Sequence, residues 1–211
     1  TDGVTLDIAF RAVQARNNSS FLCGGSEPRT ATLTVIKQIT NNHGGNNVVA
    51  DYQLFVDGVT TIPVTSGTPT VLVPGTYVVY ETGIEGYEAS FTGDCLIDGQ
   101  ITLADGDNKT CTIVNDDLPS NIHLNRVIIN DNPAHANALP STFIMRVDGV
   151  HVQNGSSIDV TSNIPHAITQ DTPSGYTVTI SGDADCPAII GGTVTLAEGQ
   201  EVSCTITSDE N

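Results

Sequence analysis

Short runs of alternating apolar and polar residues, separated by turn residues, make up most of this chain. In residues 33–39, Leu33, Val35, Lys37 and Ile39 fall on one face of an extended segment, because side chains alternate along a strand. No run shows convincing helical periodicity, and evenly spaced short strands are typical of an all-β sandwich. The further predicted strands are residues 52–56, 70–73, 77–81, 87–91, 100–103 and 110–114.

The pattern occurs twice, because short motifs recur in the same order about 90 residues apart. We therefore predict two tandem domains, copy one at residues 31–117 and copy two at residues 121–211, with a linker at 118–120. Pro119 stiffens the linker, so we expect the copies to stack as a rod. The recurring motifs are Val-Asp-Gly-Val at 56–59 and 147–150, Gly-Tyr at 86–87 and 175–176, and Cys-Thr-Ile at 111–113 and 204–206.

The charge of the chain excludes some classes of partner. Asp and Glu together number 24 and Lys and Arg only 7, which gives a formal net charge of -17. Nucleic acids and anionic membrane surfaces need a basic partner, and no run approaches the roughly 20 apolar residues of a membrane helix. We expect neither a nucleic-acid partner nor membrane insertion. The chain starts at Thr1, which is expected of a processed, mature protein.

Four of the five cysteines form two candidate disulfides, Cys95–Cys111 and Cys186–Cys204, each flanking a glycine-containing segment. Two local disulfides indicate an oxidising, extracellular location at the cell surface. Cys23 is left over, either free or bonded to another chain. Glycosylation sequons, which also favour secretion, begin at Asn17, Asn18, Asn108 and Asn154.

No constellation of residues indicates an enzyme or a cofactor. The histidines are scattered, and the glycines fall in turns rather than in a phosphate-binding loop. Acidic turns at residues 105–108 and 183–185 contain possible calcium ligands, but neither matches the EF-hand pattern. We interpret both as solvated turns and predict no metal site.

Three polar side chains are nevertheless directed toward the predicted core of copy one. Lys37 shares its strand face with Val35, Asn115 shares its face with Ile113, and Glu81 lies on the inward face of its own strand. Buried polar residues need partners. The simpler interpretation is a buried, hydrogen-bonded Lys–Glu pair with a polar neighbour.

Residues 35–37, 74–82 followed by Gly86-Tyr87, and 113–115 resemble the collagen-adhesin B-type domains. These are Ig-like, prealbumin-like sandwiches of bacterial surface proteins and pilins. The resemblance implies an intramolecular isopeptide bond between Lys37 and Asn115, assisted by Glu81. The chain has no LPxTG-like sorting signal, so the resemblance does not imply sortase assembly.

The physical chemistry of such a bond is reasonable. Burial disfavours the charged form of a lysine, so Lys37 is expected to act as a neutral amine nucleophile. A buried Glu81 is expected to hold and relay protons. Attack on the Asn115 amide would release ammonia and join the first strand of the copy to the last.

Copy two lacks all three residues at the equivalent positions. Arg126 aligns with the lysine, Gln170 with the glutamate and Ser208 with the asparagine. We therefore predict that copy two has no crosslink and relies on its disulfide, Cys186–Cys204.

Residues 1–30 precede the repeat and begin with a clean amphipathic strand. The apolar residues of this strand are Val4, Leu6, Ile8 and Phe10. Residues 15–29 form a polar connector that is longer than a hairpin needs. The strand either completes its own copy one or fills a groove in a neighbouring subunit by β-strand addition, as in proteins similar to donor-strand pili and archaeal surface threads. We favour the second alternative.

From these observations we predict a structural protein that polymerises with copies of itself. The polymer would be a pilus or fimbrium used in adhesion or biofilm scaffolding. Head-to-tail contacts that do not close generate filaments. The alternative is a monomeric surface adhesin or stalk module that binds carbohydrate or protein. A piece of a longer repeat protein is a third possibility.

Overall fold

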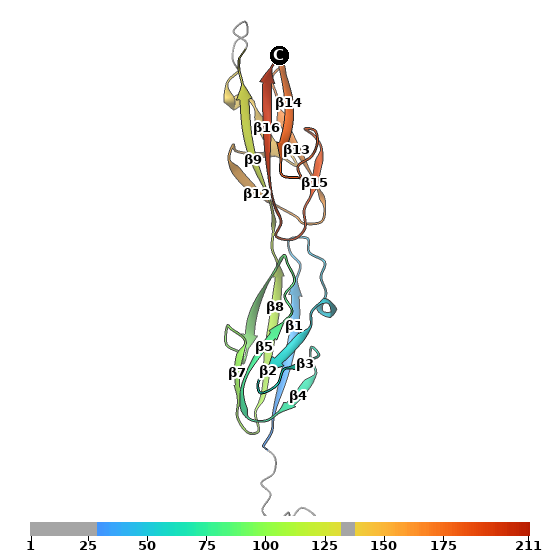
Figure 1. The fold of residues 1–211 in the computed structure, drawn as a ribbon, viewed down its shortest axis with the longest axis vertical. Helices are drawn as coiled ribbons and strands as arrows, with labels where there is room; N and C mark the ends of the chain where they lie inside the picture. The colour runs from blue at the N-terminus through green and yellow to red at the C-terminus, as the bar shows by residue number, and fades with distance from the viewer. Residues whose placement is uncertain (1–28, 132–137) are drawn as a thin grey trace, which may run out of the picture.

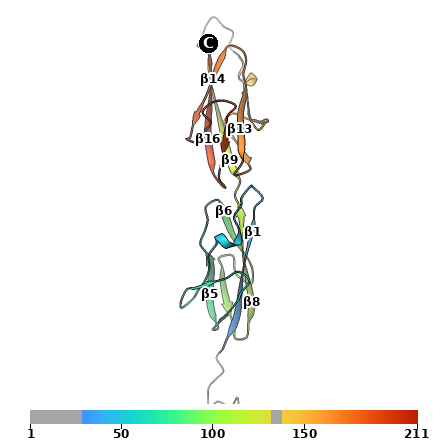
Figure 2. The same cartoon turned by 90° about the vertical axis from the view of Figure 1, so that its right-hand side faces the viewer.

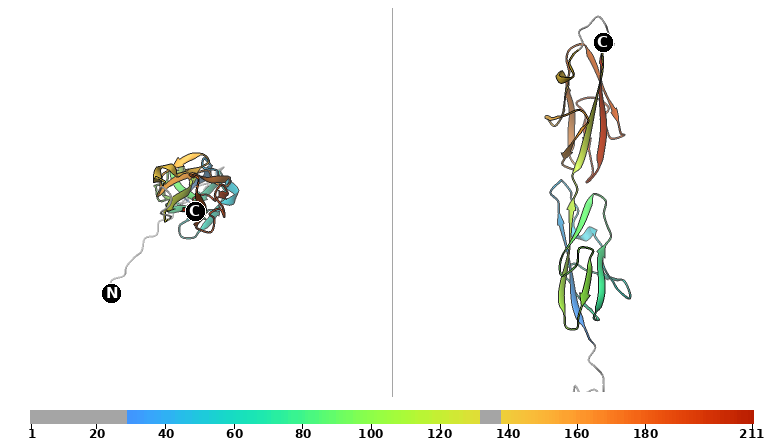
Figure 3. Two further views of the ribbon diagram at one scale, coloured as in Figure 1. Left: turned by 90° about the horizontal axis from the view of Figure 1, so that it is seen from above. Right: turned by 90° about the vertical axis from the view of Figure 1, so that its left-hand side faces the viewer.

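The chain forms two β-sandwich bodies that lie end to end in a computed structural model (Figure 1). Views from the two sides and from above agree on this rod (Figures 2 and 3). The structure describes residues 29–131 and 138–211. The predicted donor strand with Val4, Leu6, Ile8 and Phe10, the sequons at Asn17 and Asn18, and Cys23 lie outside the described residues.

Copy one consists of two four-stranded sheets, in which the prediction of an all-β sandwich is confirmed. A short 3-10 turn, η1 (Val49–Asp51), precedes the second strand. The strands are β1 Ala31–Thr40, β2 Leu54–Asp57, β3 Ile62–Val64, β4 Pro69–Leu72, β5 Gly75–Glu81, β6 Tyr87–Gly93, β7 Gln100–Leu103 and β8 Asn108–Asp117. Their order is β4-β1-β8-β6 in one sheet and β3-β2-β5-β7 in the other.

Copy two repeats this arrangement strand for strand. Its sheets have the orders β12-β9-β16-β14 and β11-β10-β13-β15, and η2 (Pro140–Thr142) replaces η1. The strands are β9 Ser120–Ile129, β10 Ile144–Val147, β11 Val150–Val152, β12 Ser156–Val160, β13 Pro165–Asp171, β14 Tyr176–Gly182, β15 Thr193–Thr195 and β16 Glu201–Glu210. Ser120, expected in the linker, begins β9.

The first and last strands of each copy are parallel neighbours. In copy one β1 pairs with β8, placing Lys37 beside Ile113, and in copy two β9 pairs with β16, placing Arg126 beside Ile206. Parallel neighbours run in the same direction, so the chain enters a copy at one end of the rod axis and leaves at the other (Figure 1).

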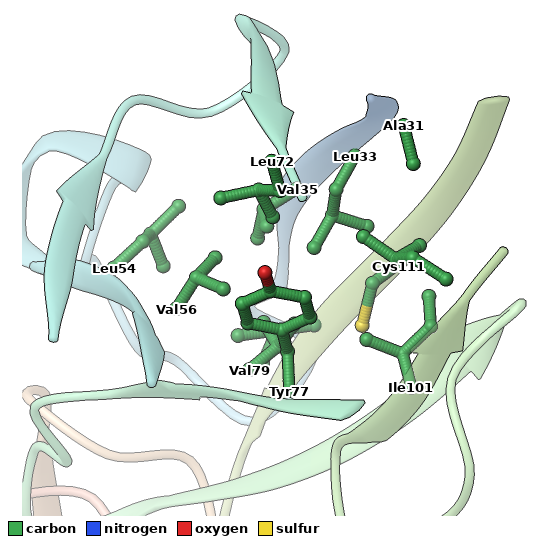
Figure 4. Packing of buried hydrophobic residues seen from close by; sticks show 12 residues of the cluster. Ala31, Leu33, Val35, Leu54, Val56, Leu72, Tyr77, Val79, Ile101 and Cys111 are labelled. Atoms are coloured by element: carbon green, nitrogen blue, oxygen red, sulfur yellow. The ribbon is translucent and has the colours of Figure 1, made fainter. Parts of the chain in front are cut away.

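The core of copy one is mainly aliphatic, with Tyr77 and Cys111 among its members, and lies between its two sheets (Figure 4). Alternate residues of β1, from Ala31 through Leu33 and Val35 to Lys37, are buried, as the period of two predicts. The sequence pattern missed β3, a three-residue strand with Pro63 at its centre. It also placed Tyr52 inside a strand, whereas Tyr52 follows η1 and precedes β2.

The two copies meet at an interface that we call the joint. Copy one and its linker contribute residues 41–45, 86 and 118, and copy two contributes residues 161–163 and 197–200. The Ser162 N–H donates to the His43 carbonyl at 2.7 Å, and Asn163 Nδ2 donates to the Gly44 carbonyl at 3.0 Å. These hydrogen bonds hold the copies in one line.

In the described part of the chain, no helix is long and apolar enough to cross a membrane.

Candidate functional site: a buried Lys–Glu–Asn cluster

Lys37, Glu81 and Asn115 converge in copy one from three strands. Lys37 comes from β1, Asn115 from the neighbouring β8, and Glu81 from the end of β5 in the opposite sheet. The Lys37 side chain is 0% and the Glu81 side chain 5% exposed, and Asn115 is 1% exposed. The structure thus places all three side chains in the interior, the direction that strand periodicity predicts.

The contacts of Lys37 connect the cluster. Its Nζ donates a hydrogen bond to Asn115 Oδ1 and lies 3.0 Å from Glu81 Oε2. The approach to Oε2 has the distance of an ion pair without hydrogen-bond geometry, and Glu81 Oε1 is buried with no hydrogen-bond partner among the described residues. The amine therefore touches the amide of one neighbour and the carboxyl of the other.

Burial lowers the pKa of Lys37 below its usual value of 10.5, and the adjacent Glu81 carboxyl opposes this shift without cancelling it. A lower pKa increases the population of the neutral amine at a given pH, and only the neutral amine has a lone pair for attack on a carbonyl carbon. The environment of Lys37 thus favours the form that an acyl-transfer reaction needs.

Tyr52 is a fourth member of the cluster that the sequence pattern did not identify. The centroid of its ring lies 4.3 Å from Lys37 Nζ, and its ring packs edge-on against Tyr87. An aromatic face covers the amine on one side and excludes water from it. Tyr52 lies in the turn before β2, where no strand period could indicate its direction.

In copy two, a neutral hydrogen-bonded pair replaces the cluster. Gln170 Nε2 donates to Ser208 Oγ at 2.7 Å, and Arg126 Nη1 donates to the Phe143 carbonyl at 2.6 Å. Phe143 occupies the position of Tyr52. Copy two therefore has neither a buried amine nor an amide aligned for attack.

Asp117, two positions beyond Asn115 on the same strand face, holds the end of copy one. Its carboxylate accepts the backbone N–H groups of Asn42 at 2.7 Å, His43 at 2.9 Å and Gly45 at 2.6 Å. Burial raises the pKa of Asp117, but these three donors outweigh burial and the pKa lies below its usual value. The period-two rule that found Asn115 also reaches Asp117, which the sequence analysis did not single out.

The only group of three possible metal ligands in the described residues is His43, Asp116 and Asp117. Because the Asp117 oxygens already accept the backbone donors of the 41–45 loop, this group is explained as a loop anchor. In the acidic turn at 105–108, Asp107 Oδ2 accepts the Ala104 N–H at 2.8 Å and lies 3.3 Å from Lys109 Nζ.

The remaining candidate residues are located as follows. The predicted disulfides Cys95–Cys111 and Cys186–Cys204 are both formed. Asn154 is exposed in the turn between β11 and β12, whereas Asn108, also exposed, is the first residue of β8 rather than part of a turn. Glycosylation at these two positions stays a prediction.

Residues 28–113 match a family model described as a prealbumin-like fold domain. Copy one thus matches this domain over almost its whole length. The match covers β1 to β7 and the part of β8 up to Ile113, including Lys37 and Glu81. The resemblance to prealbumin-like domains in the sequence is thereby confirmed, and copy two has the same strand order.

Among solved structures, similar chains include the TIE protein of Bacillus anthracis, with 12% identity and a TM-score of 0.47. That comparison covers 86% of this chain and 34% of the TIE chain, so this chain spans about a third of it. The major pilin protein (T-13) of Streptococcus pyogenes is similar at 13% identity and a TM-score of 0.36, covering 87% of this chain and 97% of the pilin. No curated protein matches the chain.

Proposed function

We propose that the protein is a structural subunit of an extracellular filament on the cell surface, in which copy one carries a Lys37–Asn115 isopeptide crosslink. The observation that carries the proposal is the buried contact between Lys37 Nζ and Asn115 Oδ1, beside Glu81. This contact joins the first and last strands of copy one, and a covalent bond there has no role in ligand binding or turnover.

The position of the contact matters for mechanical load. When a rod is pulled along its axis, tension enters copy one through β1 and leaves through β8. These strands are parallel neighbours over nine residue pairs, from Thr32–Asn108 to Thr40–Asp116, so pulling shears their hydrogen bonds together. A bond between Lys37 and Asn115 carries the load directly and leaves the rest of copy one unstressed.

The crosslinking reaction balances without a cofactor. Lys37 transfers a proton to Glu81, and its neutral Nζ then attacks Asn115 Cγ. A new Nζ–Cγ bond forms, and Glu81 gives its proton to Nδ2 and accepts a second proton from Nζ. The Cγ–Nδ2 bond then breaks, ammonia leaves, Nζ keeps one hydrogen as an amide, and Glu81 ends protonated. The reaction occurs once per molecule, so the protein is not an enzyme in the usual sense.

Polymerisation is proposed to use the amphipathic strand of residues 4–10, inserted into a neighbouring subunit by β-strand addition. In support, β4 pairs only with residues 31–34 of β1, and β12 only with residues 120–124 of β9. Within the described residues, the rest of β1 and β9 has no strand neighbour on that side. Each copy thus offers an incomplete sheet edge.

Intact mass and electron microscopy test the two parts separately. The crosslink predicts that the purified chain with its disulfides reduced is lighter than its sequence mass by one ammonia molecule. Assembly predicts thin filaments with a helical repeat, which are lost on deletion of residues 1–14 while both copies stay folded. A measured mass equal to the full sequence mass would contradict the crosslink, and filaments that survive the deletion would contradict strand insertion.

One feature favours a second candidate function, ligand binding by a monomeric adhesin. A mostly apolar groove of about 520 Å³ lies beside β2 and β3, and its lining includes Val49, Phe55 and Val64. Monomers that retain binding to an immobilised carbohydrate or protein after deletion of residues 1–14 would support this function over the filament.

A further inference from the structure

In its described residues, the outer end of copy two repeats two contacts of the end of copy one that forms the joint. In copy one, Tyr87 donates its hydroxyl hydrogen bond to Asn41 Oδ1 at 2.8 Å. In copy two, Tyr176 donates to Asn130 Oδ1 at 2.5 Å. The same aromatic anchor thus shapes both ends, although the two sequences have diverged widely between these positions.

The backbone hydrogen bond that closes this end is also repeated. The Leu118 N–H donates to the Gly86 carbonyl at 2.8 Å in copy one, and the Asn211 N–H donates to the Gly175 carbonyl at 2.9 Å in copy two. Gly86 and Gly175 have φ values of 82° and 88°. The backbone at Gly175 therefore presents the surface that Gly86 presents inside the chain.

The opposite end of the rod carries the matching half of the joint. Copy two enters the joint with the turn 197–200, in which the Ala197 N–H donates to Gln200 Oε1 at 2.9 Å. The turn 104–107 of copy one has the same form, with the Ala104 N–H donating to Asp107 Oδ2 at 2.8 Å. Figure 1 places this end of copy one opposite the end with the C-terminus.

Inside the chain these two halves are in close contact. A Cβ built on Gly86 would lie 2.5 Å from the Glu198 carbonyl oxygen, and one built on Gly199 would lie 3.4 Å from the Gly86 Cα. At the outer ends the equivalent glycines, Gly175 and Gly106, would meet no atom of the described residues within 4 Å. At these two glycines each outer end thus has the form of one half of the joint, with no described residue packed against it.

We propose that a second copy of this chain docks end to end on the first through this half-joint, with turn 104–107 of one subunit against Gly175 of the next. The inference rests on the proposed filament function and specifies its longitudinal contact. The interface is heterologous, and because its two halves lie at opposite ends of a rod, it propagates rather than closes.

Charge does not oppose this docking more than it opposes the joint. In the joint, Glu85 and Glu198 line one hollow of about 570 Å³. Their counterparts at the outer ends are Ser174 and Asp105. At this pair of positions the docked contact therefore has one carboxylate where the joint has two, so the like-charge repulsion there is smaller.

One part of the contact differs in a way that favours burial. Ser162 and Asn163, between β12 and β13, donate hydrogen bonds across the joint. The corresponding segment of copy one, between β4 and β5, consists of Val73 and Pro74. Val73 is 63% exposed, and Val71 nearby is 68% exposed. Docking covers these apolar side chains, so the contact between subunits is more hydrophobic than the joint.

Cysteine crosslinking tests the contact directly. Filaments of the full chain, in a Cys23→Ser background, would carry Asp105→Cys together with Ser174→Cys. Oxidation is expected to give a ladder of covalent multimers on a denaturing gel. The control pair, Ser174→Cys with Thr65→Cys, places the second thiol on the side of the rod and should give no ladder.

A steric variant supplies an independent test. Asparagine tolerates positive φ, so Gly175→Asn should fit the free subunit, but the Cβ of the new side chain would clash in the docked contact. The control Gly149→Asn changes a glycine of similar φ, 81°, in open space on a side turn. We expect the first variant to lose filaments and the second to keep them, with equal thermal unfolding. Both are produced without N-glycosylation, because Gly175→Asn creates a sequon.

The outcomes separate this inference from the proposed function. If the wild-type chain forms filaments but the Asp105/Ser174 pair gives no ladder and Gly175→Asn assembles normally, the end-to-end contact is wrong and the filament stands. If the wild-type chain yields only monomers that do not crosslink, both fail. A ladder together with loss of filaments in Gly175→Asn supports both.

Discussion

The two copies share one strand order, yet they stabilise the same polar corner of the sandwich in different ways. Copy one contains Lys37, Glu81 and Asn115, with an amine in contact with an amide and a carboxyl. At the equivalent positions, copy two contains a hydrogen bond between Gln170 and Ser208 and an arginine bonded to a backbone carbonyl. The fold therefore accepts different polar groups at this corner, whereas crosslink chemistry requires all three residues together.

The largest expected effect comes from removing the proton relay of copy one. Glu81→Gln preserves the shape of the cluster but stops proton transfer, so the full sequence mass should reappear. The crosslink would close a loop of 78 residues, and its loss should lower the free energy of unfolding by about 4.5 kcal/mol in the chain-entropy model. Mass spectrometry and urea unfolding measure the two effects, and an unchanged mass deficit would exclude a role for Glu81.

The comparison can also be reversed by building the cluster into copy two. The triple variant Arg126→Lys, Gln170→Glu and Ser208→Asn should lose a second ammonia and stabilise copy two by roughly 4 kcal/mol, from the same loop-closure entropy. The matched control omits Gln170→Glu and should lose only the one ammonia molecule of copy one. A triple variant that folds without losing ammonia would show that further features of copy one, such as Tyr52, are needed.

Removing each disulfide should expose how much each copy depends on it. Cys186–Cys204 spans 18 residues and Cys95–Cys111 spans 16, so each contributes about 3 kcal/mol by loop closure. Paired Cys→Ala variants should destabilise the two copies similarly, but only copy two should melt early, since copy one keeps its crosslink. Calorimetry of the two variants resolves this. If copy one without its disulfide melted at as low a temperature as copy two without its own, a crosslink in copy one would be contradicted.

Asp117 predicts a pH effect at the end of copy one that forms the joint. Its folded pKa lies below the usual 3.8, so its stabilisation is present above that value and is lost as the pH falls through the folded pKa. Asp117→Asn should remove this dependence and cost about 1–3 kcal/mol, since backbone donors lose a charged acceptor. Hydrogen exchange of residues 42–45 between neutral and acid pH is the measurement.

The smallest effect is expected at alkaline pH in a chain without the crosslink. In Asn115→Ala, Lys37 is a free amine whose folded pKa is below 10.5. The unfolded state then binds more protons between the two pKa values, so stability should rise with pH through that window, by about 1.4 kcal/mol per unit of difference. The double variant with Lys37→Met should show no such rise. A rise of equal size in both variants would assign it to other groups.

The sequence by itself determined most of the strands of copy one, the duplication and three of the four members of the cluster. Strand periodicity assigns each side chain to a face, so the positions of Lys37 and Asn115 within their strands are enough to direct both side chains inward. Cysteine spacing likewise indicated both disulfides, because each pair is local.

Tertiary structure alone decided which of these residues touch. The parallel pairing of β1 with β8 depends on how two strands 78 residues apart meet, and no local pattern encodes that register. Tyr52 covers the amine from a turn, where direction follows from packing rather than from period. The joint and the similar features at the outer ends depend on backbone atoms and glycines. The pattern of side chains along the sequence does not indicate which of these atoms meet.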